Sequence, residues 1–226
     1  MRHSLTYKVK ELASNLGADM VGIASQKSFS KAPHGHRPQD LLRDAKSVIV
    51  IAVSLPESSF ESAPSREYSA AYLAANSELN RIAFHISKLL EKEGFRAIQI
   101  PAAMPYDYET DMGDLSHRHA ANLAGLGSFG KSCLLLTERF GPRVRLVSVA
   151  TNAELSHDPR SDLDHCGSCT KCLDACPSGA LSGPGIIDKK KCNEQHEKVG
   201  EELGLSDEEQ ICGVCIKVCP VGKPID

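Results

Sequence analysis

Apolar side chains along this chain follow two patterns, a spacing of three or four residues and short continuous runs, and each pattern predicts its own kind of element. In residues 4–16 and again in 68–93 they return every three or four positions, which is typical of amphipathic helices. Residues 47–53 are almost wholly apolar and rich in Val and Ile, which is typical of a buried strand. The pattern predicts helices over 4–16, 68–93 and 116–123, and strands over 20–24, 47–53, 96–100, 133–137 and 144–151.

The pattern changes after about residue 160. Before that point the predicted elements include a β-α-β order, and about 160 residues are enough to bury an independent core. Residues 152–164 form a polar linker, and the rest of the chain has little apolar periodicity but holds eight of the nine cysteines. We therefore expect an α/β domain over 1–160 and a cysteine-rich module over 161–226.

The cysteines of the module have the spacing of iron–sulfur proteins. The first run reads C-x2-C-x2-C-x3-C-P, the bacterial [4Fe–4S] pattern in which the fourth cysteine binds the other cluster. A second, shorter run follows, and Cys192 lies alone between the two and fills the remaining position. We expect two ligand sets, Cys166, Cys169, Cys172 and Cys219 for one cluster, and Cys176, Cys192, Cys212 and Cys215 for the other.

Two other uses of these cysteines are possible. C-x2-C pairs also bind zinc, but zinc sites would not need the prolines that follow Cys176 and Cys219. Disulfides are disfavoured because most of the cysteines are too close in sequence to bridge. The ninth cysteine, Cys133, lies in an apolar run and is expected to be a small buried hydrophobic residue. His165, directly before Cys166, is expected to hydrogen-bond near a cluster.

Composition narrows the class of protein. The chain has no apolar stretch of 18 residues and does not begin like a signal peptide, so we expect a cytoplasmic protein without a membrane span. Its net charge of −3 neither requires nor excludes nucleic acid, and the absence of tryptophan gives little support for a base-stacking surface. The basic residues 189–191 are interpreted as a solvated loop; the alternative is a docking patch for phosphate or an acidic electron donor.

In combination, several segments resemble the epoxyqueuosine reductase family. They are the glycine-rich residues 124–136, the cysteine run of 166–180, the lone Cys192, and the earlier segments 17–24 and 37–49. Respiratory reductive dehalogenases are more distant relatives of the same kind. The resemblance implies an α+β fold, with an N-terminal α/β domain similar to flavin nitroreductases and a ferredoxin-like module that carries two [4Fe–4S] clusters. It also implies a bound, base-off cobalamin.

The resemblance further implies which residues bind cobalamin and act on the substrate. The family's proton-donating aspartate lies 14 residues before the first glycine of its A-G-L-G segment, and in this chain that position is Asp111. A general acid must keep its proton near neutral pH, so this role requires a raised pKa. The alternative is that Asp111 is an ordinary loop carboxylate, like Asp107 and Asp114. The implied cobalamin contacts are Arg37, Asp111, Gly127, Gly130, Lys131 and Ser132.

The implied function is a reductase. Electrons from a low-potential donor such as ferredoxin or flavodoxin would pass through the two clusters to cobalamin, for reduction of a C–O bond as in epoxyqueuosine. The substrate would be a small molecule or a modified nucleoside. Support for tRNA is weaker, because longer members continue into a helical-repeat domain that helps to hold tRNA and this chain stops at Asp226. The alternative is an electron-transfer protein without its own cobalamin, relaying electrons to a corrinoid protein or another redox partner; a third hypothesis replaces cobalamin with flavin.

Overall fold

The computed structural model describes residues 2–103, 107 and 112–222, and contacts between residues divide the chain into two units. The first unit comprises Met1–Val53, Asn76–Leu126 and Arg145–Asp162, and the second comprises Ser54–Ala75, Gly127–Val144 and Leu163–Asp226. The division after Asp162 lies near the boundary that the sequence predicts, but the second unit also takes in two earlier segments. The two contiguous domains, 1–160 and 161–226, stay a prediction.

The first unit is built on a four-stranded sheet with the strand order β1-β2-β6-β3. In that order the strands are β1 (Met20–Ser25), β2 (Ser47–Ser54), β6 (Val144–Thr151) and β3 (Ala97–Ile100). β1 pairs antiparallel with β2, and β3 pairs antiparallel with β6. The predicted strand ranges are confirmed to within one residue at each end.

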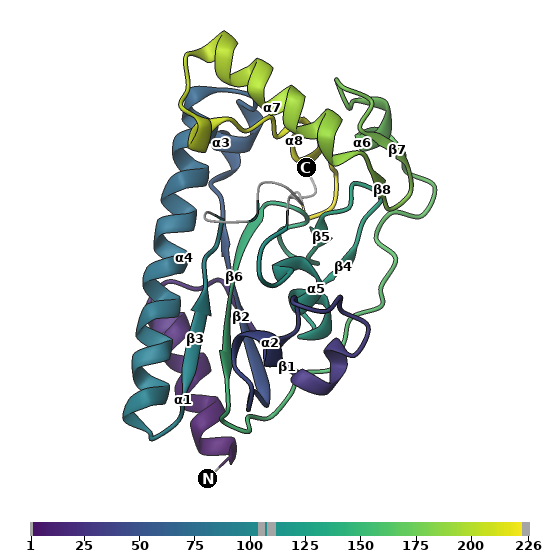
Figure 1. The fold of residues 1–226 in the computed structure, drawn as a ribbon. Coiled ribbons are helices and arrows are strands. Elements are labelled where there is room, and N and C mark those ends of the chain that lie inside the picture. The colour runs from purple at the N-terminus through teal and green to yellow at the C-terminus, as the bar shows by residue number, and fades with distance from the viewer. Residues whose placement is uncertain (1, 104–106, 108–111, 223–226) are drawn as a thin grey trace. The chain divides into compact units, whose positions relative to one another are not determined.

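Two helices cover one face of this sheet (Figure 1), α1 (Arg2–Asn15) and the part of α4 (Arg66–Lys92) that begins at Asn76. Leu79 and Ile82 of α4 are fully buried and share one apolar core with Val9 of α1 and Ile49 of β2. Burial of one such side chain stabilises a fold by about 1.5–3 kcal/mol, so the three- and four-residue spacing is what holds α4 on the sheet. No helix in the described ranges is both long and apolar enough to cross a membrane.

The opposite face of the sheet is also covered. Successive strand residues point to opposite faces, so Gly22 points away from the core that contains Ile23. On that side it meets the end of α5 (His117–Leu123), because a Cβ atom at Gly22 would lie 2.3 Å from the carbonyl oxygen of Ala124. Only a glycine allows this close approach. The first unit also contains the short helices η1 (Gln26–Phe29) and α2 (Pro38–Leu41).

The second unit consists mainly of short elements. They are α3 (Glu57–Glu61), the hairpin of β4 (Ser128–Phe129) and β5 (Leu135–Leu136), α6 (Lys171–Asp174), the hairpin of β7 (Leu181–Gly183) and β8 (Ile186–Ile187), α7 (Lys189–Leu203), η2 (Asp207–Glu209) and α8 (Val214–Lys217). α7 begins after Asp188, whose carboxylate accepts a hydrogen bond from the amide of Lys191, and ends at Gly204, which has a φ of 64°. The chain therefore has a mixed α/β fold, as predicted.

Three predictions for the second unit were wrong. The strand expected over 133–137 is reduced to Leu135–Leu136, because Cys133 has a φ of 59° and belongs to the turn that follows β4. Cys133 is also partly exposed, not buried. The basic residues 189–191 do not lie in a loop but form the exposed first turn of α7. Because α7 is polar on most sides, its sequence carries little apolar periodicity that could have predicted it.

Candidate metal centre

The eight cysteines of the two runs all lie in the second unit, on loops and short helices. Three of them lie on helices, Cys172 on α6, Cys192 on α7 and Cys215 on α8. The other five lie on the adjoining loops. No disulfide forms among the cysteines, all of which belong to the described residues.

Four of the thiols interact as one set, which we call the first cysteine group: Cys166, Cys169, Cys172 and Cys219. Burial raises the pKa of Cys172, and the nearby thiols of Cys166, Cys219 and Cys169 raise it further. Burial also raises the pKa of Cys219, which interacts with Cys166 and Cys169 as well. The first cysteine group has the same members as the first ligand set expected from the sequence.

The other four thiols form the second cysteine group: Cys176, Cys192, Cys212 and Cys215. Burial raises the pKa of Cys215 to about 12, with smaller contributions from Cys212, Cys192, Cys172 and Cys176. Burial raises the pKa of Cys212 too, and Cys176 adds to that effect. Since Cys172 of the first group also raises the pKa of Cys215, the two groups are neighbours within the second unit.

Groups of neighbouring, partly buried thiols would bind cations. A thiol ligates a metal as its thiolate, and a positively charged ion is what makes several neighbouring thiolates stable in one place. Among the described residues, however, no three His, Cys, Asp or Glu side chains converge as one metal ion requires. That the groups ligate clusters stays a prediction.

Hydrogen bonds also reach the sulfur atoms, as they do in iron–sulfur proteins. The amide of Lys131 donates to Cys166 Sγ over 3.4 Å. Burial raises the pKa of Cys176, but hydrogen bonds from the backbone amides of Leu181, Ser178 and Ala180 outweigh it, and the pKa is lowered overall. Such donors stabilise negative charge on sulfur.

Two positively charged side chains, Lys131 and Arg143, lie at the first cysteine group. Lys131 Nζ donates to the carbonyl oxygens of Gly167 at 2.8 Å and Cys169 at 3.0 Å. Arg143 is 4% exposed and donates from Nη2 to the carbonyl oxygen of Cys219 at 3.0 Å. Among the described residues, two buried side-chain nitrogens have no hydrogen-bond partner, Arg143 Nε and His165 Nε2. The unpaired guanidinium nitrogen of Arg143 fits an anionic group near Cys219, and His165 Nε2 can donate a hydrogen bond in one of its two tautomers. A hydrogen bond from His165 near a cluster stays a prediction.

A histidine lies at the second cysteine group. His196 Nε2 is 3.8 Å from Cys192 Sγ, and both residues lie on α7, one turn apart. Burial lowers the pKa of His196. The sequence did not point to His196 or Arg143, because each acquires its partner only through folding or helix register.

The residues predicted to bind cobalamin are divided between the two units. Asp111 lies outside the described residues. Arg37, in the first unit, donates from Nε to the carbonyl oxygen of Ala32 over 2.9 Å, and its charge also acts on Asp40. Its two terminal nitrogens form no hydrogen bond within the described part of the chain. Those nitrogens could meet an amide or carboxylate of a bound molecule. Arg37 thus stays a predicted contact.

The second unit contains the other predicted contacts, Gly127, Gly130, Lys131 and Ser132. Three of them, Gly127, Gly130 and Lys131, make contacts within this unit that support its structure. A Cβ atom at Gly127 would lie 2.2 Å from the carbonyl oxygen of Leu136, and one at Gly130 would lie 2.6 Å from the Leu136 side chain. Both glycines therefore allow the β4–β5 hairpin to close. Lys131 hydrogen-bonds to the carbonyl oxygen of Gly167, which follows Cys166, and Ser132 is buried, with 5% of its surface exposed. Their contact with cobalamin stays a prediction.

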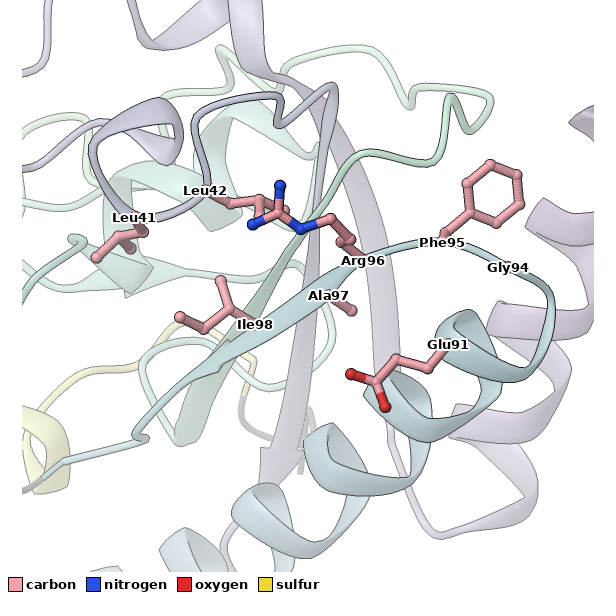
Figure 2. Close-up of a pocket in the computed structure, with 8 residues that line it drawn as sticks. All are labelled: Leu41, Leu42, Glu91, Gly94, Phe95, Arg96, Ala97 and Ile98. Atoms are coloured by element: carbon pink, nitrogen blue, oxygen red, sulfur yellow. The ribbon is translucent and has the colours of Figure 1, made fainter.

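An open depression lies on the first unit (Figure 2). Its lining residues are Leu41, Leu42, Glu91, Gly94, Phe95, Arg96, Ala97 and Ile98. Arg96 is paired with Asp44 at 3.1 Å, and no predicted site residue lies in the lining. The depression therefore carries no candidate chemistry.

Comparisons with known proteins agree with this geometry. The family model described as "4Fe-4S double cluster binding domain" matches residues 165–222. An epoxyqueuosine reductase of Gloeobacter violaceus is 31% identical over 222 residues, which cover 93% of this chain and 67% of that protein. The chain spans about half (51%) of the length of two Bacillus epoxyqueuosine reductases that it also matches.

Solved structures share the fold. An epoxyqueuosine reductase from Bacillus subtilis superposes with a TM-score of 0.71 at 26% identity, over 97% of this chain and 66% of that one. The catabolic reductive dehalogenase NpRdhA superposes with a TM-score of 0.79 at 21% identity, over 99% of this chain and 32% of that one. The second likeness shows the fold alone.

Proposed function

This chain belongs to the epoxyqueuosine reductase family, and from that membership we propose that it is an iron–sulfur reductase that binds two [4Fe–4S] clusters. The observation that carries the proposal is the division of eight thiols into two groups of four. Each group has the ligand number of one cubane cluster. Because the chain matches only about half of some relatives, its activity and substrate are part of the proposal.

The residues around the thiols fit bound clusters. A cluster, when bound, supplies a centre that takes up and releases one electron. The first cysteine group would hold it with the amide of Lys131 donating to sulfur, and the second with the amides that donate to Cys176. Arg143 and His165 would supply donors that the described residues leave unused. Because such thiolates need a reducing compartment, we place the protein in the cytoplasm.

We further propose cobalamin as the acceptor of the electrons. When bound, it would supply a cobalt centre able to reduce a C–O bond in a small molecule or a modified nucleoside. Arg37 would contact it through its terminal nitrogens, and Asp111 would hold the proton that the substrate receives. Ferredoxin or flavodoxin would be the donor. The similarity of the first unit to flavin nitroreductases stays a prediction.

A specific observation favours the second candidate, an electron-transfer protein without its own cobalamin. Gly127, Gly130 and Lys131 were expected to cradle the corrin ring, but their contacts within the second unit account for them fully as structural residues. Arg37 and Asp111 are then the residues on which the enzyme hypothesis depends.

The experiment is anaerobic reconstitution with iron and sulfide, followed by metal analysis and absorption spectra with and without hydroxocobalamin. We expect about eight irons per chain, and one corrin per chain if the enzyme hypothesis holds. Cys169→Ser should lose the first cluster, while Cys133→Ser, the matched control outside both groups, should keep all the iron. Zinc in place of iron and sulfide would contradict the whole proposal.

Two variants separate the candidates. Arg37→Gln should weaken corrin uptake without changing the iron content, and Asp111→Asn should abolish turnover while leaving both cofactors in place. Full iron content with no corrin uptake by the wild-type chain would favour the electron-transfer protein. Flavin uptake in place of corrin would favour the third hypothesis.

A further inference from the structure

We propose that Arg143 and Lys131 are positioning residues that raise the reduction potential of a cluster in the first cysteine group above that of a cluster in the second. This inference rests on the proposed function, since it requires both clusters. It goes beyond that function by assigning the two clusters different potentials and by naming the side chains that cause the difference.

Arg143 is a buried cation whose charge has no ion-pair partner in the described part of the chain. Its Nη1 donates to the carbonyl oxygen of Phe140 at 3.2 Å, its Nη2 donates to that of Cys219 at 3.0 Å, and its guanidinium lies 4.7 Å from the ring centroid of Phe60. These neutral partners fix the side chain but do not balance its charge. An arginine stays charged in proteins, so burial without an anion is costly.

The anion that would balance this charge is the first cysteine group with its cluster. Arg143 Nη2 binds the carbonyl oxygen of Cys219, a member of that group. Glu57 and Glu61 also carry charge near Arg143, but no ion pair joins either carboxylate to it in the described part of the chain. A cubane cluster with four thiolates is anionic in both of its redox states, so it would remain the partner throughout electron transfer.

Lys131 adds a second cation at the same group. Its amide donates to Cys166 Sγ, and its ammonium binds the carbonyl oxygens of Gly167 and Cys169. One residue thus ties the β4–β5 hairpin to the loop that carries the first two cysteines. The position of the ammonium is fixed by two hydrogen bonds of ordinary length.

The cations next to the second cysteine group in sequence are placed differently. Lys189, Lys190 and Lys191 precede Cys192 in the first turn of α7, and their side chains are exposed. Solvent therefore screens their charge far more than it screens the charge of the buried Arg143. The backbone donors at Cys176 also favour negative charge, but they are neutral dipoles and act more weakly than full charges.

The consequence for redox chemistry follows from charge. Reduction adds one electron, and therefore one negative charge, to a cluster without adding a proton. A fixed cation nearby stabilises the reduced form more than the oxidised form, which raises the potential. The first cluster should therefore accept an electron before the second.

The experiment is an anaerobic redox titration of the reconstituted full chain with dithionite, followed by electron paramagnetic resonance. Dithionite supplies one electron per cluster, so the wild-type protein should show two one-electron waves. Arg143→Gln should lower the upper wave so that its reduction equilibrium constant falls at least tenfold, which is about 59 mV for one electron. Arg143→Lys should retain most of the wild-type potential, and Lys131→Gln should lower the same wave by less.

Lys171→Gln is the matched control. Lys171 lies in the first cysteine run, but its side chain is exposed, so solvent should screen the lost charge and both waves should stay in place. Iron and sulfide are measured in every variant. If Arg143→Gln does not bind two clusters, the potentials of Lys131→Gln decide the test. An unchanged upper wave in a fully loaded variant, or an equal shift of both waves, overturns the inference. Failure of the wild-type chain to bind clusters instead overturns the proposed function.

Discussion

The two units of this chain are stabilised in different ways. The first has a continuous apolar core, in which residues such as Leu79, Ile82 and Val147 are fully buried between helices and sheet. The second has short elements and few large buried apolar residues, among them Tyr68 and Leu136, and it contains the eight thiols of the two cysteine groups, most of them partly buried. Burial of apolar side chains therefore stabilises the first unit, whereas we expect the stability of the second to depend on what its thiols bind.

The largest expected effect comes from removing the clusters. Anaerobic treatment of the reconstituted protein with ferricyanide and a chelator removes the clusters. It should lower hydrogen-exchange protection in α6, α7 and α8 by more than about tenfold, because neighbouring thiolates repel one another when no cation lies between them. Amides of β2, β6 and the Asn76–Lys92 part of α4 should change by less than about twofold, since the apolar core is untouched. Equal loss of protection in both units would contradict the comparison.

Acid should instead act on the first unit, through His117. Its ring nitrogens lie 2.8 Å from Ser148 Oγ and 2.8 Å from the carbonyl oxygen of Pro101, and the residue opens α5. Burial lowers the pKa of His117 to about 4 from its usual 6.5; the hydrogen bond to Pro101 opposes this effect, and the nearby charge of Arg145 adds to it. The folded state thus holds the ring neutral where the unfolded chain protonates it.

Because the pKa of His117 is lower in the folded state than in the unfolded chain, acid should destabilise the first unit. The stability from neutral His117 is complete above about pH 6.5 and is lost as the pH falls toward 4, because only the unfolded chain gains the proton. Between pH 7 and pH 5 the loss should be at most about 2 kcal/mol. It should appear in the exchange rates of β3 and β6 amides after correction for the intrinsic pH dependence of exchange.

Two substitutions isolate the contribution of His117. His117→Gln keeps a side chain that can hydrogen-bond but removes the titration, so the free energy of opening in the first unit should vary less with pH. The matched control is His85→Gln, at an exposed position on α4, which should leave the slope unchanged. If wild type and His117→Gln have the same slope, His117 does not act as we infer.

The two units also differ in how far the sequence predicts them. The strands of the first unit and the helices α1, α4 and α5 follow from apolar periodicity, because burial against one face is a local property of the pattern. In the second unit periodicity predicted a strand over 133–137, of which the structure keeps Leu135–Leu136 as strand, and it missed α7. The polar composition of α7 hides it, and the backbone at Cys133 follows the hairpin and not β propensity.

The candidate site shows the same limit. Cysteine spacing predicted a double-cluster module, which the match of the family model over residues 165–222 confirms, whereas the two ligand sets stay a prediction. No spacing could predict that Arg143 reaches Cys219, or that Lys131 binds the loop of Cys169, since these contacts join residues far apart in sequence. The supporting residues therefore come from tertiary structure alone.

The smallest expected effect concerns two glycines that look equivalent in sequence. Gly167 and Gly213 each follow the first cysteine of a C-G-x-C segment, and both have positive φ, 47° and 74°. A Cβ atom at Gly167 would meet no heavy atom within 4 Å, whereas one at Gly213 would lie 2.5 Å from the ring of Tyr68, which is 1% exposed. The sequence gives no sign of this difference.

Alanine at either glycine should cost about 1–2 kcal/mol, because both backbones are left-handed. Gly213→Ala should cost about 1–3 kcal/mol more, since the buried Tyr68 ring has no space into which to move. Urea unfolding of the reconstituted variants, with iron measured at each concentration, should show Gly213→Ala releasing iron first. Equal destabilisation of the two variants would mean that Tyr68 yields to the added methyl group, and that the second unit is packed more loosely around its thiols than the comparison of the two units implies.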